Sequence, residues 1–200
     1  IYAAIWGNSE GDWEIGYTIE FYPEEGKYHY TGHRNCDIVY SPNEARKMGT
    51  ICPVCGRKLT MGVMSRVESL SSYDAEIESS VDEFGVRRIR QKDGDKPGYV
   101  MLVPLLEILA ESLGVGVGSK QVMNTYEQLI NKLGSEFKIL LNTTLDEIKN
   151  IAGIRVCEAI KKVRMGDIVI KPGYDGVFGT VKIWQGDDNT QKDIDQTTLF

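Results

Sequence analysis

Two short motifs, His33-Arg34-Asn35-Cys36 and Cys52-Pro53-Val54-Cys55, dominate the first third of this chain of 200 residues. In each motif two residues separate a pair of metal-ligand side chains, and fifteen residues lie between the two pairs. This is the spacing of a two-knuckle tetrahedral zinc site, in which each short loop turns two side chains toward one ion. Gly56 follows the second motif and suits the left-handed turn of a knuckle. The sequence therefore predicts a zinc ion held by His33, Cys36, Cys52 and Cys55.

The zinc site is expected to be structural, because four protein ligands leave no open position for water or substrate. Its binding free energy would be folding free energy, on the order of 10 kcal/mol or more. The alternative is a set of buried free thiols beside a surface histidine. His29, the other histidine, lies further from Cys36 than a knuckle requires, and Cys157 is interpreted as a core residue of a helix.

The regions around the motifs predict an α+β fold, in which a small zinc-knuckle unit of β-hairpin and helix precedes a mainly helical region that ends in a β-hairpin. Alternating apolar residues with a turn after Pro23 predict a β-hairpin over 15–31. Apolar residues at helical spacing predict a helix within 59–70. Residues 71–98 are rich in serine, charge and turn formers, so they predict an exposed linker or long loop.

The second half of the sequence carries clear start and stop signals. Apolar periodicity followed by glycine predicts helices over 105–113 and 119–133. The apolar run 137–141 is interpreted as a strand. Thr144 begins another helix with a capping box, because a glutamate follows three residues later. Two β-rich segments joined by a glycine-rich connection predict a hairpin over 166–184.

The domain prediction follows from these elements. It comprises a zinc-binding unit (1–70), a linker or long loop (71–98), a helical DNA-engaging region with a terminal hairpin (99–184) and a flexible tail (185–200). The chain starts at Ile1 without a methionine, so we expect a fragment. No apolar run approaches the roughly 18 residues of a membrane helix, which favours a cytoplasmic protein without membrane contact.

A formal net charge of −6 means that any DNA contact must come from a local basic face. The segment from Ile148 to Ala159 partly matches a helix-hairpin-helix, in which a glycine turn presents backbone N–H groups to a phosphate. Arg155 stands where the second glycine is usual, and an ordinary helical hairpin with a solvated basic face is the alternative. The turn from Pro172 to Gly176 allows close backbone approach, with Tyr174 able to stack on a base, although a simple hairpin turn fits equally. The candidate DNA-binding residues are Gly153, Arg155, Lys161, Lys162, Arg164, Lys171, Gly173, Tyr174 and Gly176.

The last five residues, Gln196-Thr197-Thr198-Leu199-Phe200, place an apolar pair after a polar tail. The pattern Gln-x-x-Leu-Phe resembles the peptide by which many bacterial replication and repair proteins bind the sliding clamp. In that peptide Leu and Phe fill an apolar pocket and Gln forms hydrogen bonds beside it. Gln196, Leu199 and Phe200 are therefore candidates for partner binding.

Two stretches of the chain resemble the carboxy-terminal half of the PHP-domain family that includes endonuclease Q. The first stretch runs from the segment Gly26–Cys36 through the segment Cys52–Leu59. The second runs from Glu158–Gly166 through Pro172–Gly176. The segments Tyr99–Leu109 and Tyr126–Phe137 are also similar. The resemblance covers most of residues 15–184. It implies a parent enzyme whose amino-terminal PHP domain holds a catalytic metal cluster and cuts DNA on the 5′ side of deaminated bases.

None of the His- and Asp-rich PHP motifs occurs in this sequence, so we expect a non-catalytic portion of a metal-dependent DNA endonuclease. Its expected partners are DNA containing a deaminated base, the sliding clamp and its own PHP domain. The family is sometimes labelled helicase-related, but the sequence has no phosphate-binding P-loop, so helicase activity is not supported. The alternative function is a zinc-ribbon protein-interaction module tethered to the sliding clamp, with no direct DNA role.

Overall fold

A computed structural model of the chain describes residues 15–71, 76–94 and 96–185. The amino-terminal stretch around Ile1 and the expected partner-binding residues Gln196, Leu199 and Phe200 lie outside these ranges. No helix in the described ranges is both long enough and apolar enough to cross a membrane.

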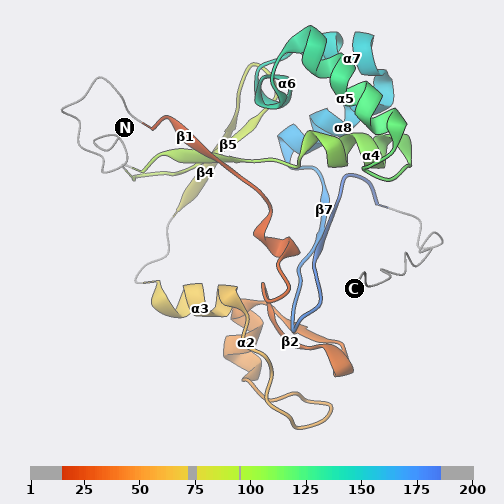
Figure 1. Ribbon diagram of the computed structural model, residues 1–200. Helices are drawn as coiled ribbons and strands as arrows, with labels where there is room; N and C mark the ends of the chain where they lie inside the picture. The colour runs from red at the N-terminus through yellow and green to blue at the C-terminus, as the bar shows by residue number, and fades with distance from the viewer. Residues whose placement is uncertain (1–14, 72–75, 95, 186–200) are drawn as a thin grey trace.

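The described chain combines a group of helices, a four-stranded sheet and a small unit, residues 27–71, that contains the four predicted metal ligands and is named the metal-binding unit (Figure 1). A two-stranded hairpin runs between the helices and the metal-binding unit, so chain segments far apart in sequence meet there. The group of helices comprises α4 (Leu105–Leu113), α5 (Lys120–Leu133), α6 (Glu136–Leu141), α7 (Leu145–Ala152) and α8 (Ile154–Met165). The α+β class predicted from the sequence is confirmed.

The helices begin and end where the sequence signals predict. α4 stops at Gly114, whose φ of 67° closes the helix in the left-handed region. α5 is capped by Ser119 and ends at Gly134. The Thr144 side chain accepts a hydrogen bond from the N–H of Glu147, and the Glu147 carboxylate bonds back to Thr144, so the predicted capping box of α7 is confirmed.

The strand predicted over 137–141 is wrong, because these residues form helix α6. Ser135 caps the helix by accepting a hydrogen bond from Lys138 N–H, and Ile139, Leu140 and Leu141 are buried. A short apolar run that is buried on most sides looks the same in sequence whether it is helical or extended. The informative signal is the serine that precedes it.

The first predicted hairpin is also wrong as a pairing. Residues 15–31 do not fold back on themselves: β1 (Tyr17–Glu20) pairs in parallel with β6 (Gly98–Met101), far along the chain. Pro23 instead starts a single 3-10 turn, η1 (Pro23–Glu25). Alternation identifies a strand but carries no information about its partner.

The linker expected over 71–98 contains two strands, β4 (Ile77–Val81) and β5 (Arg87–Gln91), in a sheet of order β1-β6-β5-β4. The charged residues that suggested a linker pair with one another across the hairpin, as Glu78 does with Arg90 and Asp82 with Arg88. Only Val86 and Ile89 of this hairpin are buried. A strand pair that buries so few apolar side chains looks like a linker to any hydrophobic pattern.

Arg164 was expected to contact DNA, and the structure buries it at 2% exposure in the middle of the helical group. Its guanidinium donates to the carbonyl oxygens of Ile139, Leu140, Thr143 and Phe84 at 2.6–2.9 Å. Two of these carbonyls close the last turn of α6, where a cation also meets the negative end of the helix dipole. Arg164 is therefore a core residue that fastens α6 and the β4–β5 turn to α8.

Replacing Arg164 with alanine should destabilise the chain by at least about 3 kcal/mol, because each buried carbonyl left without a donor costs about 1–3 kcal/mol. Arg164→Lys should fall in between, since one ammonium group cannot reach four acceptors. Lys161→Ala, at an exposed position on the same helix, should change stability by less than about 0.5 kcal/mol. Urea unfolding followed by circular dichroism measures these differences, and equal midpoints for all three variants would contradict the role of Arg164.

Candidate metal centre and the hairpin that supports it

The first metal knuckle lies between two short antiparallel strands. β2 (Thr31–His33) ends at His33, a single 3-10 turn, η2 (Arg34–Cys36), carries Cys36, and β3 (Ile38–Tyr40) returns beside β2. The reversal depends on Asp37, whose φ of 52° lies in the left-handed region. Asp is one of the few residues that tolerate this conformation. Local backbone geometry therefore turns His33 and Cys36 to the same side.

The second knuckle is a tight turn from Cys52 to Gly56. Gly56 has the predicted left-handed backbone, with φ of 72°, and its N–H donates to the carbonyl of Cys52 at 2.9 Å. Cys52 N–H in turn donates to the carbonyl of Arg57 at 2.7 Å. The helices α2 (Pro42–Met48) and α3 (Val63–Leu70) flank this turn in the sequence. The backbone thus brings Cys52 and Cys55 together without help from distant residues.

The four predicted ligands meet in space. One ligand atom from each of His33, Cys36, Cys52 and Cys55 lies within 4.8 Å of all the others. The Cys55 sulfur is 3.4 Å from Nδ1 of His33, so Nδ1 is the ring nitrogen that faces the cluster. His29 is buried outside the cluster. The cluster could hold a metal ion, and its ligands come from both knuckles.

The thiols of the cluster differ in acidity. Burial opposes ionisation of Cys52, but hydrogen bonds to its sulfur from the backbone of Cys55 and from the His33 ring lower its pKa to about 6. Burial, together with the hydrogen bonds and charges of Cys55 and Cys52, raises the pKa of Cys36 to about 11. The Cys52 thiol therefore loses its proton at a lower pH than the Cys36 thiol does. A bound cation would stabilise all three sulfurs as thiolates.

The C-terminal hairpin, β7 (Val169–Lys171) and β8 (Thr180–Lys182), confirms the strand pair predicted over 166–184. Its connecting turn packs against the first knuckle. The Tyr174 ring covers Gly32 of β2, where a Cβ atom would lie 2.5 Å from the ring. The Tyr174 hydroxyl donates to the Asp37 carboxylate at 2.7 Å. The residue that shapes the first knuckle is thus fixed from the far end of the chain.

Asp175 makes the second connection between the turn and the knuckle. Its carboxylate accepts hydrogen bonds from the backbone N–H of Arg34 at 2.8 Å and from the Thr60 hydroxyl at 2.5 Å. Burial raises the pKa of Asp175, but these bonds and the charge of Arg34 outweigh it, so the pKa is lowered overall. No local pattern in the sequence identifies Asp175 or Asp37 as supports, because their partners lie at least 115 residues away.

Several candidate DNA residues of this turn have structural roles instead. Gly173 is buried, and a Cβ atom there would lie 2.4 Å from the carbonyl oxygen of Gly26. Gly176 donates its N–H to the carbonyl of Lys27. The half-buried Tyr174 packs its ring on Gly32 and donates its hydroxyl to Asp37. Only Lys171, at the end of β7, is exposed among them.

The other candidate DNA residues lie at the turn between α7 and α8 and along α8. Gly153 joins the two helices with a φ of 85° and is exposed together with Arg155. The Arg155 guanidinium stacks on the Trp184 ring, 3.5 Å from its centroid. Lys161 is exposed, whereas Lys162 is paired with Asp167. The structure thus brings Gly153 and Arg155 together at one exposed turn. The residues of the 173–176 turn instead make contacts within the protein.

Comparison with known sequences points to one group of proteins. Residues 104–167 match the family model described as the MJ0043 C-terminal domain. The chain is 35% identical over 159 residues to an uncharacterised protein, MJ0043, of Methanocaldococcus jannaschii, covering 80% of this chain and 18% of that protein. It is 27% identical over 161 residues to the uncharacterised YqxK of Bacillus subtilis, covering 80% of this chain and 34% of that protein. The chain thus spans a fifth to a third of the length of these relatives.

Comparison with solved structures finds a similar fold in two structures of endonuclease Q. The lesion-specific endonuclease PfuEndoQ of Pyrococcus furiosus matches with a TM-score of 0.70 and 29% identity, over 90% of this chain and 40% of that chain. An endonuclease Q bound to a 27-mer duplex with an abasic lesion at the active site matches with a TM-score of 0.66 and 30% identity, over 92% and 42% of the two chains. The chain therefore has an endonuclease Q-like fold.

Removing the support from Asp175 should weaken metal binding. Asp175→Ala takes away the acceptor for Arg34 N–H and Thr60, and loss of such an outer contact costs on the order of 10-fold in metal affinity. Asp175→Asn, which tolerates the left-handed backbone and keeps one acceptor oxygen, should lose less. Competition against a chromophoric chelator measures the affinity.

Two control variants accompany the measurement of metal affinity. Cys52→Ser should lose the ion altogether and lower the melting temperature, whereas Asp167→Asn, at an exposed position outside the turn, should bind as the unaltered chain does. Equal affinity in Asp175→Ala and Asp167→Asn would show that the hairpin does not support the metal centre.

Proposed function

We propose that this chain is the metal-holding, DNA-engaging portion of a DNA-repair endonuclease related to endonuclease Q, which acts at deaminated bases. The likeness to two endonuclease Q structures at 29% and 30% identity supports this assignment. In the proposal the catalytic PHP domain belongs to another part of the parent protein. The present chain positions the nucleic acid, and the chemistry of backbone cleavage takes place elsewhere.

The observation that carries the DNA role is the turn between α7 and α8. Gly153 adopts a backbone conformation with φ of 85° and ψ of 171° that side chains disfavour, so the turn is tight and open. The first N–H groups of α8 have no intrahelical acceptor, and a phosphate oxygen is a suitable partner for them. Ile154, 60% exposed, and Arg155 extend from the same point. This arrangement favours contact with a DNA backbone over a plain helical connection.

Zinc is the metal we assign to the His33 cluster. Three thiolates and one imidazole form a soft donor set that favours zinc over calcium or magnesium, which prefer oxygen ligands. Because all four positions would be protein ligands, the ion would hold the fold and would not activate water. Elemental analysis of the purified chain would identify it.

The carboxy-terminal peptide adds a proposed partner, the replication sliding clamp. Gln196, Leu199 and Phe200 carry the pattern for this interaction. Tethering to the clamp would deliver the nuclease to newly copied DNA, and it is compatible with the DNA role. The view of the chain as a protein-interaction module alone has no support from the endonuclease Q likeness.

The DNA role predicts salt-dependent binding of the chain to a uracil-containing duplex. Lys161→Ala and Arg155→Ala should each lower the slope of log affinity against log salt by about 0.9 if each residue neutralises one phosphate. Lys120→Ala, an exposed change at the start of α5, should leave the slope unaltered. Fluorescence anisotropy between 50 and 200 mM salt measures it, and absence of binding at the lowest salt would refute the DNA role.

The clamp interaction predicts that Leu199→Ala with Phe200→Ala abolishes binding of the chain to a purified bacterial sliding clamp. A Thr197→Ala variant should bind normally, because that position carries no side chain of the motif. Surface plasmon resonance with immobilised clamp separates the two, and undiminished binding by the double variant would exclude the terminal peptide as the contact.

A further inference from the structure

The basic residues of the chain are distributed unevenly. Residues 27–71 carry seven basic and three acidic side chains, a formal net charge of +4, whereas the whole chain is at −6. Three thiolates with one divalent ion would add a single negative charge to this region. The described residues outside 27–71 carry fifteen basic and seventeen acidic side chains, so the metal-binding unit is a positively charged body attached to a nearly neutral one.

The basic side chains of this unit are accessible and mostly uncompensated. All seven are exposed, and only Arg46 forms an ion pair within the described ranges, with Glu68. The sheet behaves differently, because Arg88, Arg90 and Lys92 are paired with acidic partners on the same hairpin. A surface that keeps its cations unpaired retains the long-range field that attracts an anionic polymer.

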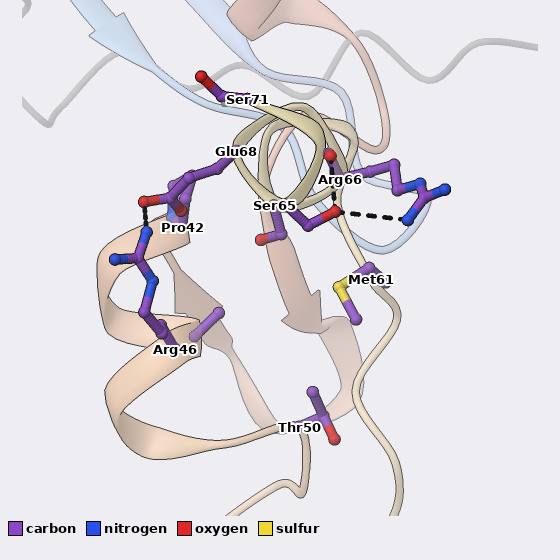
Figure 2. A pocket seen from close by; sticks show the side chains of 10 residues that line it. Pro42, Arg46, Thr50, Met61, Ser65, Arg66, Glu68 and Ser71 are labelled. Carbon is purple, nitrogen blue, oxygen red and sulfur yellow. Dashed lines mark hydrogen bonds and ion pairs between the residues drawn. The ribbon is translucent and has the colours of Figure 1, made fainter. Parts of the chain in front are cut away.

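A groove of about 640 Å³ lies between α2 and α3 on this unit (Figure 2). Arg46 on α2 and Arg66 on α3 line its two walls, and Thr50 and Ser65 add hydroxyl groups. Figure 2 shows the Arg46–Glu68 ion pair on one side of the groove and Arg66 on the other, where its guanidinium contacts Ser69. Arg66 has no carboxylate partner among the described residues.

We propose that this groove and its basic rim bind the sugar–phosphate backbone of DNA, as a contact separate from the α7–α8 turn. The chemistry fits a phosphodiester: guanidinium groups on both walls, hydroxyl donors between them and an unpaired positive field around them. The proposal rests on the proposed DNA role of the chain and extends it to a second surface. Glu68 limits the contact, since it neutralises Arg46 and presents the one carboxylate among the described residues that line the groove.

The test changes the groove charge in both directions. Arg66→Ala should weaken binding to a uracil-containing duplex and reduce the magnitude of the salt slope by about 0.9, so that over a fourfold rise in salt the variant loses about 3-fold less affinity than the unaltered chain does. Glu68→Gln removes the competing carboxylate and should raise the affinity severalfold. Lys132→Ala, which removes one exposed charge from α5 in the helical group, is the matched control and should leave the slope unchanged.

The outcomes separate this inference from the broader one. If the chain binds the duplex but Arg66→Ala and Glu68→Gln match the unaltered chain, the groove is overturned while the DNA role stands. If Lys132→Ala weakens binding as much as Arg66→Ala, the effect is one of overall charge and the groove is also overturned. If no variant and no unaltered chain binds DNA, the proposed function fails first. Metal content equal to that of the unaltered chain confirms that each variant is folded.

Discussion

The metal-binding unit depends on a contact made by the opposite end of the chain. Residues 27–71 bury only three apolar side chains, Ala45, Cys52 and Leu59, and contribute none to the main core cluster. So small a core does not stabilise a unit of this size. The remaining stability has to come from the turn of the β7–β8 hairpin and, in the proposed zinc-bound form, from the ion. Through Tyr174 and Asp175 that turn supplies the packing and the hydrogen bonds that a core would otherwise provide.

Because of this dependence, the structural units of the molecule are not continuous in sequence. The metal-binding unit is discontinuous, because the hairpin that completes it follows α8 in sequence, more than 100 residues after the knuckles. The chain that follows β8 reaches the α7–α8 turn, where the Trp184 ring stacks against Arg155. A pair of strands therefore runs between the two surfaces proposed to contact DNA.

Features determined by neighbouring residues were predictable from the sequence. The metal ligands follow from paired spacing, and the ends of α4, α5 and α7 follow from caps and glycines. Features determined by distant partners were not. The parallel pairing of β1, the sheet role of residues 77–91 and the burial of Arg164 all depend on contacts tens of residues away. The turn at Tyr174 was placed correctly as a hairpin, but its partner, Asp37, carries no local sign of the contact.

The four carbonyl bonds of Arg164 bear on how the chain can be divided. The family model covers 104–167, whereas one of the four acceptors, the Phe84 carbonyl, lies on the β4–β5 turn before that region. Expressed alone, the matched region would lose one of the four acceptors of Arg164 and would expose the surface that the sheet covers. The region matched by the family model is therefore shorter than the part of the chain that packs together. The autonomous piece extends at least from the β4–β5 hairpin, and fragments for study should be cut accordingly.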